Sequence, residues 1–215
     1  MKRLTLLGAT LVASAALAGA PDVSRVNGSI SIDPHQEAGD VSTVNGSIKV
    51  GDHATVNDVS TVNGHIEIGT EVRAKSVSTV NGDLAVGART HVSGSASTIN
   101  GGLLLEAASD VGGGLSSVNG KIRLEAAHVG SGIKTVTGDI EIGKDSHVEG
   151  GVLVEKNRYS WFSGPSRAPV IVVAPGASVS GTLRFELPVK LYVSDRATIG
   201  PVEGATVTTF SGDRP

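Results

Sequence analysis

Four titratable side chains recur along the chain at nearly one spacing. Each stands directly before a valine, and the successive steps between them are 19, 18 and 19: His91, Asp110, His128 and His147. Imidazole nitrogens and carboxylate oxygens are suitable ligands for a divalent metal ion. Copies stacked about 4.8 Å apart could share one ion if their rotamers converged. The alternative is a row of solvated corner residues. We therefore expect no metal ion or other cofactor, with this column as the single candidate.

A second set of candidates lies in one short stretch, residues 156–169, which contains three clustered aromatic residues, two arginines and two prolines. Aromatic residues and arginine are enriched at the energetic centres of protein interfaces. The stretch could therefore contact a glycan or a protein, or it could fold back and cover the neighbouring structure. The candidate contact residues are Arg158, Tyr159, Trp161, Phe162 and Arg167.

An asparagine recurs in six copies of one motif and is replaced by Thr137 in the seventh. The successive steps are 18, 18, 18, 19, 19 and 18, and the asparagines are Asn27, Asn45, Asn63, Asn81, Asn100 and Asn119. Stacked amides can hydrogen-bond to one another along an axis, or they could present their polar groups to sugar hydroxyls. Recurrence in every copy favours a structural ladder.

The elements that position these columns follow from the repeat itself, "VSTVNGSIKVG". Within one unit, Val44, Val50 and Val56 are evenly spaced, and each has a small or apolar residue two positions earlier. An i, i+2 pair indicates one face of a strand. Three such pairs in each repeat predict an all-β, three-sided parallel β-helix, with glycine and asparagine at corners that need positive φ. We expect about ten coils and a right-handed sense.

Two features leave alternatives open. Asn-Gly is also the strongest short-range hairpin signal, but an antiparallel meander does not explain the constant period. The second feature is an apolar column that the assumed phase turns outward, as a partner- or membrane-contact stripe, unless a local bulge turns it inward. Its members are Val23, Val41, Val59, Val77, Ala96, Leu115 and Ile133.

Four segments follow from the pattern. Residues 1–18 have two basic residues, an uncharged apolar run and a small-residue end, which is typical of a cleavable signal peptide. Residues 19–155 are expected to form the regular solenoid, and residues 156–169 an inserted loop. Residues 170–215 keep strand-like runs between turns and are expected to form degenerate coils and a cap on the same solenoid.

Composition limits the function classes. Without Lys2 and Arg3 the chain has 16 basic and 21 acidic residues, so it lacks the basic footprint of a nucleic-acid-binding protein. It contains no cysteine, and no segment after the N-terminal one is long and apolar enough to span a membrane. The core before residue 158 has no aromatic side chain, so it must be narrow and filled by aliphatic residues.

The repeats "VSTVNGSIKVG" and "VTGDIEIG" resemble the adhesin-like family of β-strand-repeat proteins of unknown function, over residues 23–143. The stretch "GASVSGTLRFELPVKLYVSDRATIGPVEG" is similar to bactofilins, which are polymer-forming proteins with a triangular β-helix. The resemblance implies this fold and a surface or scaffold role, and it supplies no catalytic residues. A signal peptide departs from the cytoplasmic role of bactofilins.

These features together predict an exported, non-enzymatic structural or adhesin-like protein of the cell envelope, either periplasmic or extracellular. Its strand edges at the solenoid ends could pair with other copies. The alternative is a module that binds a glycan or envelope protein through residues 156–169 or an apolar stripe. A hexapeptide-type acyltransferase is the third possibility, because the length of the repeat permits that fold.

Overall fold

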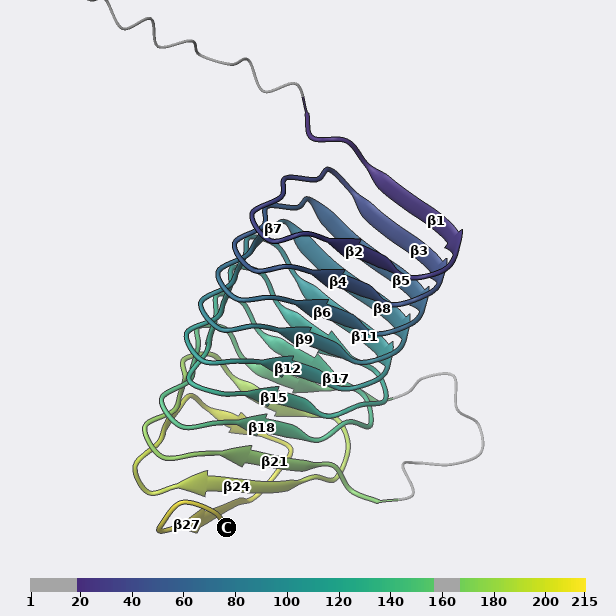
Figure 1. Cartoon of the computed structure of the whole chain (residues 1–215). Helices are drawn as coiled ribbons and strands as arrows, with labels where there is room; N and C mark the ends of the chain where they lie inside the picture. The colour runs from purple at the N-terminus through teal and green to yellow at the C-terminus, as the bar shows by residue number, and fades with distance from the viewer. Residues whose placement is uncertain (1–18, 157–166) are drawn as a thin grey trace, which may run out of the picture.

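The computed structural model describes residues 19–156 and 167–215, and within them every paired strand is parallel to its neighbours. The chain winds through three sheets of 10, 10 and 7 strands, named here sheets A, B and C in the order in which each coil visits them. Figure 1 shows the strands of sheets A and B stacked coil upon coil along a single axis. The predicted three-sided parallel β-helix is confirmed, and its right-handed sense stays a prediction.

Sheet A contains β1 (Val23–Asn27), β3 (Val41–Asn45), β5 (Asp58–Asn63), β8 (Ser76–Asn81), β11 (Ala96–Asn100), β14 (Leu115–Ser117), β17 (Ile133–Thr135), β20 (Val152–Val154), β23 (Leu183–Phe185) and β26 (Val202–Glu203). Sheet B contains β2 (Ile30–Ile32), β4 (Ile48–Val50), β6 (Ile66–Ile68), β9 (Leu84–Val86), β12 (Leu103–Leu105), β15 (Ile122–Leu124), β18 (Ile140–Ile142), β21 (Val170–Val173), β24 (Lys190–Ser194) and β27 (Val207–Phe210). Sheet C contains β7 (Arg73–Ala74), β10 (His91–Val92), β13 (Asp110–Val111), β16 (His128–Val129), β19 (His147–Val148), β22 (Ser178–Val179) and β25 (Thr198–Ile199). Coil 1 begins at β1 and coil 10 at β26.

The direction of the side chains in sheet A corrects the sequence prediction. Val41 is fully buried, whereas Val44, which was expected inside, is 41% exposed. The whole Val41 column from Val41 to Ile133 is buried, so it is core and not a contact stripe. Val23, in the first coil, is half-buried. The assignments of Val50 and Val56 to the interior were correct.

Unequal corners explain this error. The inward pairs of one coil are 41/43, 48/50 and 54/56, so the corners between them differ in length. The sequence prediction assumed three equal steps per coil, which shift the phase of sheet A by one position. Such a shift exchanges the two faces of a strand, so the stripe turns inward without a bulge.

A hydroxyl column completes the inner face of sheet A. Thr43, Thr61 and Thr79 are each 4% exposed. Each donates a hydrogen bond to a glycine carbonyl of the preceding coil, as Thr61 Oγ1 does to Gly46 O at 2.9 Å. A buried hydroxyl costs little when it is hydrogen-bonded. The threonines therefore join the aliphatic core, whose fully buried large side chains are isoleucine and leucine.

The Asn-Gly corner lies between sheets A and B. It needs glycine because the backbone of the neighbouring coil is too close for a Cβ atom, and not because φ is positive. A Cβ atom on Gly64 would lie 2.0 Å from the carbonyl oxygen of Gly46 in the preceding coil. In this column only Gly28, in the first coil, has a positive φ, at 107°. The expectation of positive φ at this corner was therefore wrong for the stacked copies.

Positive φ occurs instead at the corner between sheets B and C, and the residues there are mostly not glycine. The column comprises His35, His53, Glu71, Arg89, Ala108, Ala126 and Asp145, with φ between 45° and 62°, followed by Gly176 at 74°. This conformation costs about 1–2 kcal/mol per L-residue. The stack of coils imposes it at each level.

The coil is extended at one level. In sheet B, Ile140 pairs with Ile171, whereas the preceding pair in the same column is Ile122 with Ile140 and the following one is Ile171 with Leu191. The step from Ile140 to Ile171 is therefore the long one. The extra chain lies between β20 and β21, which is the level at which the Asn-Gly corner would otherwise recur. Residues 170–215 then continue all three sheets with β21 to β27.

Candidate functional site

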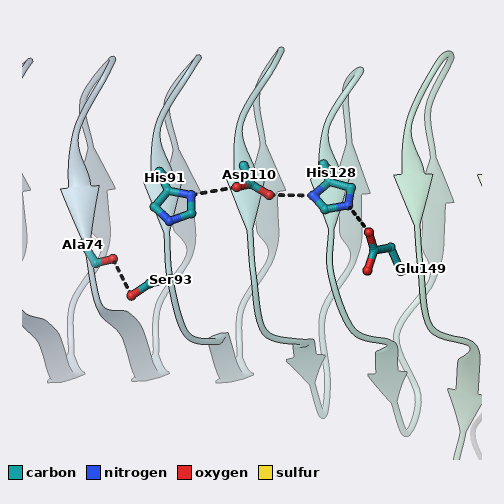
Figure 2. Close-up of polar contacts among 6 residues, drawn as sticks. All are labelled: Ala74, His91, Ser93, Asp110, His128 and Glu149. Carbon is teal, nitrogen blue, oxygen red and sulfur yellow. Dashed lines mark hydrogen bonds and ion pairs between the residues drawn. The ribbon is translucent and has the colours of Figure 1, made fainter.

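The histidine–aspartate column lies on the outer face of sheet C. His91, Asp110, His128 and His147 are paired residue to residue in adjacent strands. Asp110 lies between two imidazoles: its Oδ2 is 2.7 Å from His91 Nδ1 and its Oδ1 is 2.5 Å from His128 Nδ1 (Figure 2). His128 Nε2 is 3.2 Å from Glu149 Oε1 on the other side. Figure 2 shows the three residues and Glu149 as one chain of contacts.

These contacts shift the pKa values of Asp110 and His128. Partial burial by itself raises the pKa of Asp110, but hydrogen bonds from His128 and His91 outweigh it and hold the pKa below its ordinary value. The hydrogen bond to Asp110 raises the pKa of His128, against partial burial and with help from Glu149. The column thus favours an ionised aspartate beside a protonated histidine.

The contacts do not assemble a metal centre. His147 is in register, but its Nδ1 is 2.7 Å from Ser178 Oγ and takes no part in the chain of contacts. Both carboxylate oxygens of Asp110 contact imidazole nitrogens, so they are already occupied. In the part of the chain that the structure describes, no three acidic or histidine side chains are grouped to hold an ion.

The asparagine ladder forms on the exposed Asn-Gly corner. Each Nδ2 donates to the Oδ1 of the preceding coil's asparagine, at 3.0 Å for Asn45 and at 2.9 Å for Asn63, Asn81, Asn100 and Asn119. Thr137 Oγ1 ends the series with a 2.8 Å hydrogen bond to Asn119 Oδ1. The amides thus bond to one another along the axis, as the structural interpretation of Asn27 to Asn119 predicts.

Of the loop candidates, only Arg167 lies among the described residues, since Arg158, Tyr159, Trp161 and Phe162 lie outside them. Arg167 makes a bidentate ion pair with Asp139, with Nη1–Oδ1 at 3.1 Å and Nη2–Oδ2 at 2.6 Å. Asp139 also accepts from the backbone N–H of Val170. Burial by itself raises the pKa of Asp139. The hydrogen bonds from Arg167 and from this N–H outweigh burial, so the pKa of Asp139 lies below its ordinary value. Arg167 therefore anchors the chain to coil 7.

A surface that the sequence prediction missed covers the outer face of sheet A. Two outward columns run along coils 1 to 6, and we call them the serine–valine face: Ser24, Ser42, Ser60, Ser78, Ser97 and Ser116 with Val26, Val44, Val62, Val80, Ile99 and Val118. Val26 is 67%, Val62 40% and Ile99 43% exposed. The recurring "S-x-V" was visible in the sequence, but the shifted phase placed it inside.

The N-terminal end carries an arginine where the repeat has an inward threonine. Arg25 pairs with Thr43 in register, and its Nη1 donates to the carbonyl of Ser29 at 2.8 Å. The equivalent carbonyl one coil later, that of Ser47, accepts from the backbone N–H of Ile30. Arg25 therefore supplies the donor that a further coil would give. It thereby caps the carbonyl of Ser29 at the N-terminal end of the solenoid.

A shallow groove of about 490 Å³ lies beside the corner between sheets B and C, where Ala107 and Ala126 leave room. Residues near the C-terminus reach back to it, and Lys144 Nζ contacts Asp213 Oδ1 at 2.8 Å. Lys121 likewise pairs with Glu141 there. Two ion pairs join residues that line the groove, Lys144 with Asp213 and Arg123 with Glu125.

Comparisons with known proteins give no family: no family model matches the chain, and no curated protein or solved structure does either. The architecture implied by the resemblance, a parallel β-solenoid of repeating coils, is what the structure shows. Membership in the adhesin-like family or among the bactofilins stays a prediction. No helix within residues 19–156 and 167–215 is long and apolar enough to cross a membrane.

Proposed function

We propose that this chain is an exported, non-enzymatic β-solenoid that acts as a rigid structural or adhesin-like element of the cell envelope. The observation that carries the proposal is how its polar side chains are used. Many of them join neighbouring coils along the axis. Examples are the asparagine ladder, the histidine–aspartate column around Asp110 (the Asp110 column) and the ion pair of Lys49 with Glu67 at 2.8 Å. Side chains bonded in this way stiffen a rod of ten coils, about 48 Å long at one strand spacing per coil.

Export is supported by the sequence of residues 1–18, which lie outside the described residues. The basic start, the apolar run and the Ala16-Leu17-Ala18 end favour cleavage after Ala18. The absence of cysteine means that a fold outside the cell depends on packing alone. The buried aliphatic columns supply that packing.

Fractionation with intact-mass measurement tests the proposal. The wild-type chain is expected in the envelope or outside the cell, with the mass of residues 19–215. A Leu11→Arg variant, which breaks the apolar run, is expected to stay inside at full length. Full-length wild-type protein in the cytosol would contradict export, and a catalysed reaction lost on substitution of Asp110 would contradict a non-enzymatic role.

Self-association through the ends is also part of the proposal, and the N-terminal end is the guarded one. A charged side chain at an inward position is one way in which proteins block edge pairing. Replacing Arg25 with threonine restores the residue of the repeat and frees the Ser29 carbonyl. Light scattering should then show larger assemblies for Arg25→Thr than for the wild type, and equal masses would argue against pairing at this end.

The alternative role, binding a glycan or an envelope protein through residues 156–169, is supported by the Arg167–Asp139 ion pair, which fixes one end of that segment to the rod. A Trp161→Ala variant that folds but no longer associates with the envelope would favour this role. Unchanged association of this variant with the envelope would argue against a binding role for residues 156–169.

A further inference from the structure

The serine–valine face differs from the other two sides of the rod in having no charge. The outer face of sheet B carries charges of both signs, with Lys49 paired to Glu67 and Lys121 to Glu141. Sheet C carries the Asp110 column. Over six coils the serine–valine face presents only hydroxyls and aliphatic side chains, four of them at least 40% exposed: Val26, Val44, Val62 and Ile99.

We propose that this face binds the same face of a second copy, with the two rods antiparallel and coil 1 of one facing coil 6 of the other. This inference goes beyond the proposed function and does not depend on export. In this arrangement valine columns meet valine columns. Val44 lies opposite Ile99 of the second copy, and Val62 lies opposite its Val80.

The period of the surface favours a second copy as the partner. The exposed aliphatic side chains recur once per coil, at the spacing of paired strands, about 4.8 Å. Side chains with that spacing meet evenly along the whole face only when the opposing surface has an equal period. Another copy has that period by construction, and a two-fold arrangement satisfies both faces at once.

Charge fixes the orientation and the register. Beyond coil 6 the same outward columns carry Lys134, paired with Glu155 at 2.7 Å, and Arg184, paired with Glu203 at 2.8 Å. Sliding the rods further along each other would bury these charges against valine, which is costly. In the proposed register coils 7 to 10 extend past the partner.

The acidic rim of the face is compatible with the antiparallel arrangement. Beside the serine column, coils 2 and 3 carry Asp40 and Asp58, while coils 4 and 5 carry Ser76 and Ser95 at the same positions. Antiparallel pairing places Asp40 opposite Ser95 and Asp58 opposite Ser76. Like charges then do not meet, and each carboxylate faces a hydroxyl.

The area of the face sets the expected strength. Five residues of strand across six coils cover roughly 16 by 29 Å, so two copies bury on the order of 1,000 Å² in total. That area is at the lower limit for a specific interface. The dimer should therefore form reversibly and depend on protein concentration.

Cysteine cross-linking tests the arrangement directly, because the chain has no cysteine of its own. We would mix Val44→Cys and Ile99→Cys proteins and add a bis-maleimide with a span of about 10 Å, the distance between packed sheets. The mixture should give a heterodimer, whereas Val44→Cys alone should not, since its two copies lie about three coils, or roughly 14 Å, apart along the axis. The matched control is Thr55→Cys, alone or mixed with either variant, because Thr55 is exposed and bridges to Arg73 of sheet C, away from the serine–valine face.

A charge substitution gives a second measurement. Val62→Lys should leave the fold intact, because the side chain is 40% exposed, and should weaken dimerisation at least tenfold in sedimentation analysis. Thr55→Lys should leave it unchanged. A wild-type protein that stays monomeric at every concentration, or Val44→Cys cross-linking as readily alone as with Ile99→Cys, would overturn the proposal.

Discussion

The two corners that flank sheet B solve the same turning problem in opposite ways. At the Asn-Gly corner the backbone is in an ordinary conformation, yet glycine is required, because the neighbouring coil's carbonyl lies where a Cβ would be. At the corner between sheets B and C, residues such as His53 and Ala108 have positive φ, yet side chains are accepted there. Closeness to the neighbouring coil, more than a residue's own dihedral angles, decides which corner keeps glycine.

The difference extends to what the corners display. The Asn-Gly corner repeats one amide, and that amide bonds to its own kind. The other corner varies: the rings of His35 and His53 stack with centroids 4.7 Å apart, and Arg89 pairs with Glu71 at 2.8 Å. A corner that tolerates side chains can change its chemistry from coil to coil, whereas a corner fixed by contact cannot.

The sharpest test of this comparison uses two adjacent glycines. A Cβ on Gly101 would lie 2.0 Å from the carbonyl of Gly82, while one on Gly102 would meet nothing closer than 3.5 Å. Gly101→Ala should destabilise the protein by about 3 kcal/mol or more, and Gly102→Ala by less than about 0.5 kcal/mol. Urea denaturation of both variants measures this, and equal losses would refute the contact explanation.

The phase of sheet A gives the next largest effect. In one repeat, Val59 is 1% and Val62 40% exposed. Val59→Ala should lower the free energy of unfolding by about 2 kcal/mol, since it removes two buried methyl groups and leaves a cavity. Val62→Ala should cost less than about 0.5 kcal/mol. A larger loss for Val62→Ala than for Val59→Ala would show that Val62 faces the core, as the sequence prediction of three equal steps per coil requires.

The architecture could be predicted from the sequence because the sequence repeat corresponds directly to the stacking of one coil on the next. The period, the parallel sheets and the Asn27–Asn119 ladder all follow from identical residues recurring at one interval. The direction of Val41 and Val44 could not be predicted, because both valines fit an apolar core and only the corner lengths separate them. Thr43 also looks exposed by type, and its bond to a glycine carbonyl appears only once coils are stacked.

The candidate site was predicted in part for the same reason. Register placed His91, Asp110 and His128 together, as their spacing implied. The paired hydrogen bonds that occupy Asp110 depend on rotamers, which spacing does not specify. The capping role of Arg25 was missed because this residue departs from the repeat in one copy only. The serine–valine face was missed because the predicted phase of sheet A placed its residues inside the core.

Relief of strain at the second corner should produce a smaller effect of opposite sign. Ala108 has a φ of 59°, so Ala108→Gly should stabilise the protein by up to about 1 kcal/mol, the left-handed penalty less the added entropy of glycine in the unfolded chain. Ala107→Gly, whose φ is not positive, should destabilise it slightly. Thermal unfolding of the pair gives the signs, and a loss of stability in Ala108→Gly would show that the corner is not strained.

The smallest expected effect is a pH dependence of stability that distinguishes the histidine–aspartate column on sheet C from the asparagine ladder at the Asn-Gly corner. The raised pKa of His128 contributes stability that is complete below the ordinary histidine pKa, about 6.5, and is lost as pH rises through the raised value. The lowered pKa of Asp110 contributes stability above its ordinary value, about 3.9, and loses it as pH falls further. The column should therefore stabilise the protein most between about pH 4 and 6.5.

A matched pair of variants isolates this contribution. From pH 5.5 to 8.5 the wild type should lose about 0.5 kcal/mol relative to His128→Asn, a small value because solvent screens a half-exposed ion pair. The side chains of His128 and Asp110 are each 39% exposed. Asn63→Ala breaks two ladder bonds that do not titrate, so its cost should be the same at both pH values. Urea denaturation curves for the three proteins decide the matter. If the His128→Asn difference did not change with pH, the Asp110 column would be no more sensitive to protons than the asparagine ladder.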